Sequence, residues 1–196
     1  MILLSLDEYI NGIIDQGRSY VNVNINISHC IFSRSKVYSL DNGYGGVIYI
    51  NGGTYSMILN YSMFHNCFSS ERGGAIYPSS TNSDLRMICA NNCSCGSSCV
   101  GNFAYIIASH VNQVEYLSIS NCSITTSRYN PIILFSGNQS VYNINMSMNN
   151  DYLGSGICTY SPSTFTSSYC TYSNNKASYG ICLYLYNLRN NYDVIF

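Results

Sequence analysis

Polar and apolar residues alternate strictly in two stretches of the chain. The segment from Val21 to Ser28, VNVNINIS, places β-branched residues on one face and amides on the other, and the segment from Val141 to Met148 repeats this pattern. A period of two residues is typical of a β-strand with one buried face, because successive side chains point to opposite sides of a strand. The same pattern would spread apolar residues around a helix, so these stretches predict strands.

Apolar runs recur along the chain at a nearly constant distance. They are GGVIYI from Gly45, GGAIYP from Gly73, GNFAYIIA from Gly101, YNPIILFS from Tyr129, SGICTYS from Ser155 and YGICLYLY from Tyr179, so their starts are 28, 28, 28, 26 and 24 residues apart. A fixed period of this size indicates a repeat architecture in which each unit buries its apolar face on its neighbours. Two or three short strands per repeat fit one coil of a parallel β-helix, whereas a β-sandwich needs no such period.

A second series places Cys or Asn three residues after an apolar residue. Its members are Ile27/Cys30, Phe64/Cys67, Ala90/Cys93, Ile119/Cys122, Met146/Asn149 and Tyr172/Asn175. Each repeat therefore has two landmarks, and the fold class predicted is all-β, a parallel β-helix of about six coils with a period of 24–28 residues.

The first 20 residues do not repeat. We expect residues 21–196 to form the repeat domain and residues 1–20 to form an N-terminal cap or an incomplete first coil. A short helix is one form of this cap, because Ser5 to Glu8 has the spacing of a capping box and apolar residues follow it. An incomplete first coil is the alternative.

The GGA-type motif and the residues before it resemble a known family. Gly73, Gly74, Ala75 and Ile76 follow Phe64, Asn66 and Cys67, and Gly45 and Gly46 begin a second copy with Val47 in place of Ala. This arrangement resembles the polymorphic outer membrane protein repeat, marked by GGA with an aliphatic residue and a preceding Phe-x-x-Asn, although Cys67 stands where the family has Asn. The resemblance implies a right-handed parallel β-helix of the pectin-lyase-like superfamily and a surface-displayed, adhesin-like protein.

Composition narrows the possible partners. Only 9% of residues are charged and the formal net charge is −1, so nothing favours nucleic acid or an anionic membrane, which are normally bound by clustered Lys and Arg. No apolar run approaches the ~20 residues of a membrane span, and no signal peptide is visible. The ten Cys residues favour an oxidising compartment. We therefore expect a cell-surface or extracellular location.

The cysteines suggest two kinds of local chemistry. Cys89, Cys93, Cys95 and Cys99 are the densest group, but their spacing differs from that of usual zinc sites, so packed thiols or local disulfides are expected and no metal or cofactor is predicted. Cys158 and Cys182 both end a Gly-Ile-Cys run. If these runs stack one coil apart, the two residues form a thiol ladder or a disulfide.

Six Asn-x-Ser sequons are candidate glycosylation sites if the chain is exported. They lie at Asn26, Asn60, Asn92, Asn121, Asn138 and Asn145. About five are expected by chance from the numbers of Asn, Ser and Thr, so the sequons alone do not argue for secretion.

Evidence for catalysis is weak in the sequence. The nine carboxylates are scattered, and no two beyond the N-terminus occupy equivalent positions of adjacent coils. His29 and His65 both precede a Cys of the second series and could stack, but repeat geometry explains this equally well. We expect a noncatalytic scaffold whose Asn, Ser and Tyr faces contact a host surface, a glycan or, end to end, another copy of the chain. The alternatives are a polysaccharide-active lyase- or glycosidase-like enzyme and a truncated family fragment without its own function.

Overall fold

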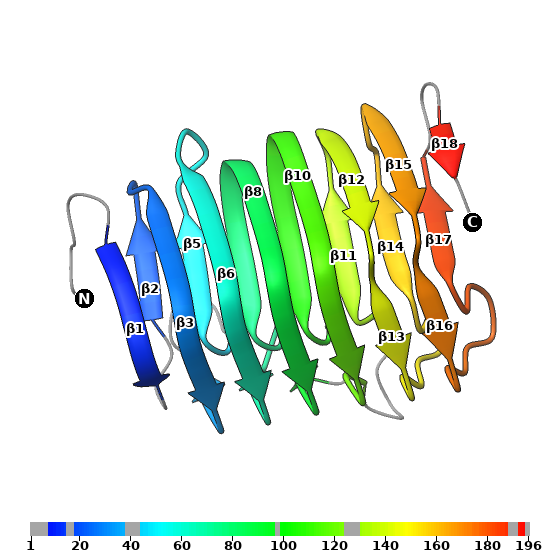
Figure 1. Ribbon diagram of the computed structural model, residues 1–196, viewed down its shortest axis with the longest axis horizontal. Helices are drawn as coiled ribbons and strands as arrows, with labels where there is room; N and C mark the ends of the chain where they lie inside the picture. Colours follow the sequence, from blue (N-terminus) through cyan, green and yellow to red (C-terminus); the bar gives the residue numbers. More distant parts are fainter. Residues whose placement is uncertain are drawn as a thin grey trace.

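The protein is a right-handed parallel β-helix, as the repeat and the resemblance predict. The computed structural model describes residues 8–14, 18–37, 44–96, 99–123, 130–187 and 192–194, and this part of the chain contains strands and turns without a helix. Successive coils lie side by side from the N-terminal to the C-terminal end, and the strands of the front and rear layers run in opposite directions (Figure 1). Each strand pairs in parallel with its equivalents in neighbouring coils.

The strands form three faces. The first face contains β2 (Arg18–Val21), β5 (Ile48–Asn51), β11 (Ile132–Phe135), β14 (Ile157–Tyr160) and β17 (Leu183–Tyr186). The second face contains β1 (Glu8–Ile14), β3 (Ile25–Ser33), β6 (Ser56–His65), β12 (Asn138–Tyr142), β13 (Asn145–Ser147), β15 (Thr164–Ser168), β16 (Thr171–Ser173) and β18 (Tyr192–Val194). The short third face contains β4 (Lys36–Val37), β7 (Phe68–Ser69) and β9 (Ser94–Cys95). Two long strands, β8 (Ile76–Asn91) and β10 (Ala104–Ser120), continue from the first face into the second.

The interior is a continuous apolar cluster that extends through the coils. Equivalent residues of neighbouring coils lie next to one another, so the rings of Phe32 and Phe64 stack with centroids 4.7 Å apart. Phe103, which enters the interior from another part of its coil, meets Phe64 edge-on at 5.4 Å. The alternation read from the sequence is correct within a strand but changes phase at corners. Val141, Ile144 and Met146 are all buried because Asn143, at φ 52°, turns the chain between them.

The glycine pair has two different roles. Gly73 adopts φ 66° and turns the chain into β8, as expected for a glycine corner. Gly74 instead lies against the next coil, where a Cβ atom would come within 1.9 Å of the Asn102 carbonyl oxygen. The motif therefore needs one glycine for its backbone conformation and the other for close approach.

The N-terminal segment is part of the solenoid where it is described. Strand β1 pairs with β3 and strand β2 pairs with β5. Glu8–Ile14 is thus a strand and not part of a short helix, while residues 1–7 and 15–17 of the predicted cap or first coil lie outside the described residues.

Two of the predicted equivalences between coils are wrong. Ile27 pairs with Leu59, and Phe32 is the residue opposite Phe64, so the equivalent of Cys67 is Ser35 and not Cys30. The sequence pattern does not distinguish two different corners of the coil. His29 precedes Cys30 at one corner and Asn66 precedes Cys67 at the other, and both adopt positive φ.

The proposed Cys158–Cys182 ladder or disulfide is also wrong. Ile157 pairs with Leu183, which leaves Cys182 opposite Gly156, and Cys158 is buried whereas Cys182 is exposed. The matching Gly-Ile-Cys letters are two residues out of register.

Candidate binding surfaces

A column of bulky side chains marks the first corner of the second face. We call it the aromatic corner, and it consists of His29, Tyr61, Met87, Tyr116 and Tyr169, with Tyr142 beside it and Asn143 in the corner of its coil. The corner residues adopt φ between 46° and 56°, the left-handed region that costs a bulky residue roughly 1–2 kcal/mol. Gly or Asn would meet the backbone requirement more cheaply, so the size of these side chains has another cause.

The side chains of the aromatic corner lie on the surface. Tyr61, Met87, Tyr116 and Tyr169 are 46–64% exposed. The His29 and Tyr61 rings stack at 5.0 Å, and Tyr142 meets Tyr116 at 5.9 Å and Tyr169 at 5.3 Å, both edge-on. Ring contacts thus form two groups along the corner, one of His29 and Tyr61 and one of Tyr116 and Tyr169 with the half-buried Tyr142.

The two halves of the aromatic corner have different neighbours. Beside His29 and Tyr61, the outward residues of the next strand segment are Ile31 and Met63, each 44% exposed. Beside Tyr116, Tyr142 and Tyr169, the corresponding residues are polar and exposed. These residues are Ser118, Asn145 and Thr171. The second half thus combines ring surfaces with hydroxyl and amide groups, a composition suited to sugars.

The second corner, which leads to the third face, is built mainly from asparagine. We call it the Asn corner, and its residues are Arg34, Asn66, Asn92, Asn121, Met148 and Asn174, with φ between 51° and 59°. The Asn92 amide donates to the side-chain oxygen of Asn66 at 2.5 Å. Asn tolerates the left-handed region better than most residues, which explains its use here.

Directly inside the Asn corner lies a column of buried polar side chains. Asn149 accepts from the Cys122 amide at 2.8 Å and donates to the Ile119 carbonyl at 3.4 Å, and Asn175 repeats this pattern on the next coil. In three earlier coils the position holds Cys67, Cys93 and Cys122, whose thiols are buried. Contact with Cys93 and burial raise the pKa of Cys67, while burial, followed by contact with Cys122, raises the pKa of Cys93. The raised pKa values favour the neutral thiol at Cys67 and Cys93, and the buried side chains of the column serve as packing.

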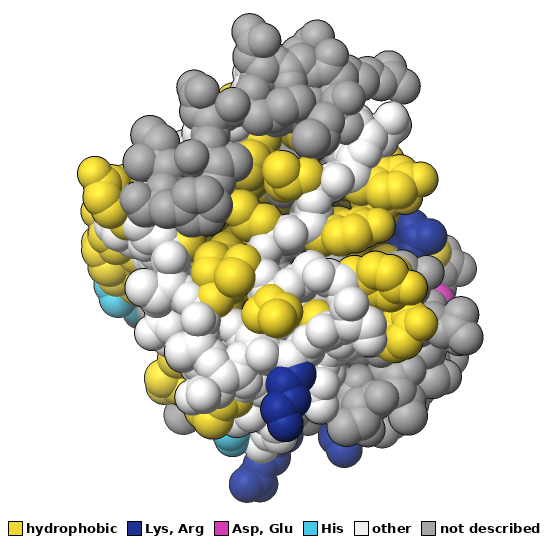
Figure 2. Space-filling view, turned by 90° about the vertical axis from the view of Figure 1, so that its right-hand side faces the viewer, with side chains coloured by type: hydrophobic (Ala, Val, Ile, Leu, Met, Phe, Trp, Pro, Cys, Tyr) yellow, Lys and Arg dark blue, Asp and Glu magenta, His cyan; other side chains and the backbone are white. Residues whose placement is uncertain are grey.

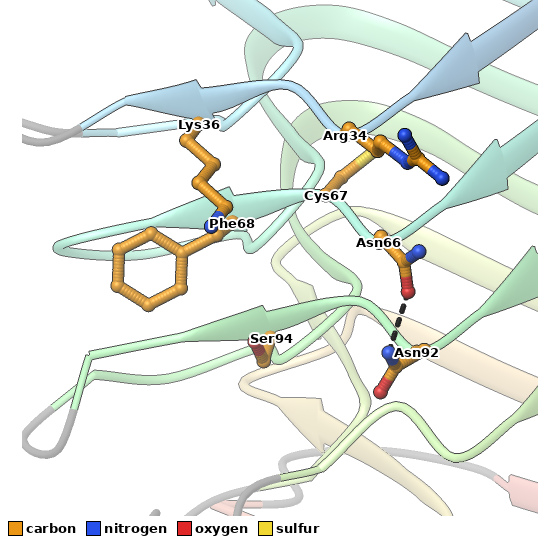
Figure 3. Close-up of a pocket in the computed structure, with 7 residues that line it drawn as sticks. All are labelled: Arg34, Lys36, Asn66, Cys67, Phe68, Asn92 and Ser94. Carbon is orange, nitrogen blue, oxygen red and sulfur yellow. Dashed lines mark hydrogen bonds between the residues drawn. The ribbon is translucent and has the colours of Figure 1, made fainter.

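The Asn corner and the third face enclose a shallow groove (Figure 3). It has a volume of about 810 Å³ and is lined by Arg34, Lys36, Asn66, Cys67, Phe68, Asn92 and Ser94. The sequence alone does not reveal this groove, because it depends on the pairing that brings Phe68 and Ser94 beside Lys36.

The four cysteines of the cysteine-rich segment lie in different surroundings. Cys95 and Cys99 are joined by a disulfide, with Cα atoms 5.9 Å apart, while Cys93 belongs to the inner column. Cys89 lies on β8 opposite Met63 and Ser118. Across the described residues no group of three or more His, Cys, Asp or Glu side chains is placed to hold a metal. The Cys95–Cys99 disulfide agrees with the local disulfide that was one of the two expectations for this segment.

The second face carries a small ion network that the sequence does not reveal, because its two carboxylates do not occupy equivalent positions of neighbouring coils. Arg86 contacts Asp84 at 2.8 Å and Glu115 at 3.8 Å, because the carboxylates lie diagonally across neighbouring coils. The hydrogen bond and charge of Asp84 raise the pKa of Arg86. Both carboxylates contact the Arg86 guanidinium on an open surface. This arrangement resembles a surface salt bridge more than the general acid and general base of a catalytic site.

The remaining candidate residues are dispersed. His29 and His65 do not stack, since His29 packs on Tyr61 at one corner and His65 lies between Ser33 and Asn91 before the other. Five of the six sequon asparagines are exposed and Asn60 is half-buried. Glycosylation of these sites remains a prediction.

Apolar side chains are visible on the C-terminal end of the solenoid (Figure 2). Ile181, Tyr179 and Tyr186 are 48%, 66% and 44% exposed, and Leu183 and Leu185 are partly buried. Among the described strands, β17 pairs with β14 alone and β16 with β13 alone. The described residues include no helix long and apolar enough to cross a membrane.

Comparison with family models, curated proteins and solved structures yields no match.

Proposed function

We propose that the protein is a noncatalytic, adhesin-like scaffold at a cell surface or in the extracellular space, and that it binds glycans through the aromatic corner. The observation that carries this proposal is the pair of exposed rings of Tyr116 and Tyr169, at corner positions where smaller residues would be less strained, with the half-buried ring of Tyr142 between them. Strained residues persist where function requires them. The resemblance of Gly73–Ile76 to the polymorphic outer membrane protein repeat, within the pectin-lyase-like superfamily, supports the surface location.

Binding to neutral oligosaccharides tests this proposal. Immobilised lactose, N-acetyllactosamine, cellohexaose and chitohexaose are the probes, and we expect the chain to retain at least one of them. Replacing Tyr116 and Tyr169 by Asn, which suits their backbone, should weaken retention by about tenfold or more. Tyr152→Asn is the matched control, because Tyr152 is 54% exposed but lies away from the aromatic corner. Retention of none of the probes, or an equal effect of the control, would refute the proposal.

The alternative of a polysaccharide-active enzyme has one supporting observation, the proximity of Asp84 and Glu115 to Arg86. Incubation with pectin, alginate and the neutral oligosaccharides, followed by assay of new reducing ends and unsaturated products, distinguishes the two functions. The scaffold predicts no product. Product formation that is abolished by Asp84→Asn and Glu115→Gln would establish the enzyme instead.

End-to-end contact between copies is a further part of the proposal. The apolar side chains around Ile181 support it, and so do the edges of β16 and β17 with which no further described strand pairs, because sheet edges readily pair with other chains. Sedimentation across a range of concentrations should show association that Ile181→Lys reduces. A monomer at every concentration would exclude it.

A further inference from the structure

The groove of Figure 3 has two walls that run across three coils. One wall is the outer side of the Asn corner, with Arg34, Asn66 and Asn92 in successive coils. The other wall is the outer side of the third face, where Lys36 pairs with Phe68 and Phe68 with Ser94. Inward-pointing residues such as Cys67 separate the walls. Coil stacking spaces equivalent groups roughly 4.8 Å apart, so the groove spans about 10 Å along the axis.

Positive charge is concentrated at one end of this groove. Arg34 and Lys36 are exposed and lie in the same coil, one on each wall. Within the described residues, neither forms an ion pair, whereas Arg86 is paired with Asp84 and Arg72 lies 5.2 Å from the Tyr105 ring centre. A chain with only eight Lys and Arg thus places two of them at the same opening. An anionic group between the walls would interact favourably with both.

The backbone at Arg34 gives a second, independent indication. Arg34 adopts φ 59° at a position where Asn66 and Asn92 occupy the following coils. A long side chain in the left-handed region is more strained than Asn, so the guanidinium is retained at a cost in stability. The cationic end is therefore a departure from the pattern of its own corner.

The rest of the groove is neutral and offers other contacts. Phe68 is half-buried and presents ring surface, Asn66 and Asn92 form a hydrogen-bonded pair of amides, and Ser94 adds a hydroxyl. A length of about 10 Å accommodates roughly two sugar rings. Ring surface and amides suit neutral sugars, and the cations suit an acidic one.

We infer that this groove binds a short oligosaccharide whose terminal sugar carries a carboxylate, with the acidic sugar between Arg34 and Lys36 and neutral sugars over Phe68 and the paired asparagines. The inference rests on the proposed glycan-binding function and adds a second site with its own ligand chemistry. No bond is formed or broken, since the groove binds its ligand by charge and contact.

Titration of the full chain with sialyllactose and lactose tests the inference, because these sugars differ by one acidic residue. We expect sialyllactose to bind at least about tenfold more tightly than lactose, and more weakly as salt is added. Arg34→Asn, which keeps a residue suited to the backbone, and Lys36→Gln should each remove most of this preference. Arg72→Gln, an exposed cation outside the groove, should leave it unchanged.

Equal affinities for the two sugars, or a preference that survives in the Arg34→Asn Lys36→Gln double variant, would overturn the inference. Unfolding midpoints of all variants should match the parent chain, which excludes loss of binding by misfolding. Failure here is distinct from failure of the proposed function. If the Tyr116→Asn Tyr169→Asn variant loses neutral glycans while sialyllactose shows no preference, only the groove inference fails.

Discussion

The aromatic corner and the Asn corner meet the same backbone requirement with different residues. Both place one residue per coil at positive φ, and in the central coils they are only five residues apart, as with Met87 and Asn92. The Asn corner mostly uses the residue that tolerates this conformation, whereas the aromatic corner uses Tyr, Met and His. The comparison teaches that the backbone conformation alone does not explain the bulky residues of the aromatic corner, since asparagine meets the same requirement five residues further on.

The largest effect on stability is expected for a residue just inside the Asn corner. Asn149→Ala removes hydrogen bonds to the Cys122 amide and the Ile119 carbonyl, so we expect the free energy of unfolding to fall by about 3 kcal/mol. Urea denaturation measures it, with exposed Asn145→Ala as a control that should change stability by less than about 0.5 kcal/mol. A similar fall for both variants would contradict the role of Asn149. Cooperative unfolding of the parent chain in this experiment would also argue against the fragment alternative.

Exchanging residues between the corners of one coil has a smaller effect. Asn92→Met places a bulky residue at positive φ and removes the hydrogen bond to Asn66, so stability should fall by about 1.5 kcal/mol. Thermal and urea unfolding report this change. An unchanged stability would mean that the Asn corner does not depend on asparagine.

The reciprocal substitution, at the aromatic corner, should raise stability instead of lowering it. Met87→Asn relieves strain at an exposed position, and we expect stability to rise by roughly 0.5 to 1 kcal/mol. The same denaturation experiments measure it, with Met63→Asn as a control because Met63 is similarly exposed but does not have positive φ. A loss of stability in Met87→Asn would show that the aromatic corner is selected for folding and not for binding.

The smallest effect concerns the thiols inside the Asn corner. Burial raises the pKa of Cys93 above its unfolded value, so the protonated thiol contributes stability that is fully present below about pH 8.5 and is lost as pH rises toward the folded pKa. Stability measured from pH 7 to 10 should therefore decline less steeply in Cys93→Ala than in the parent chain. Exposed Cys182→Ala is the control, and an identical slope in Cys93→Ala would contradict this assignment.

The fold could be predicted from the sequence because its signals are periodic. Alternation identified strands such as the one beginning at Ile25, and the Gly45, Gly73 and Gly101 runs are equivalent, as Ile48, Ile76 and Ala104 pair in register. The exact register of later coils could not be predicted. Coil length varies there, and the letters of Gly180-Ile-Cys match Gly156-Ile-Cys better than the true partner does.

The binding surfaces were less predictable for a physical reason. An Asn such as Asn92 indicates positive φ by its own preference, but a Tyr such as Tyr116 gives no such indication. Whether a tyrosine lies in a strand or at a corner depends on pairing with the neighbouring coils. The contact of Arg86 with Glu115 across neighbouring coils and the approach of Phe68 to Lys36 likewise depend on register.

The uninterrupted strands β8 and β10 have a consequence for how the molecule opens. Each carries one coil directly from the first face into the second, and they pair with each other along most of their length. Other coils change face through breaks between separate strands. Opening in such a stacked array proceeds by loss of units from its ends. Amide protons of these two central strands should therefore exchange with solvent most slowly, and protection should decrease in steps toward both ends.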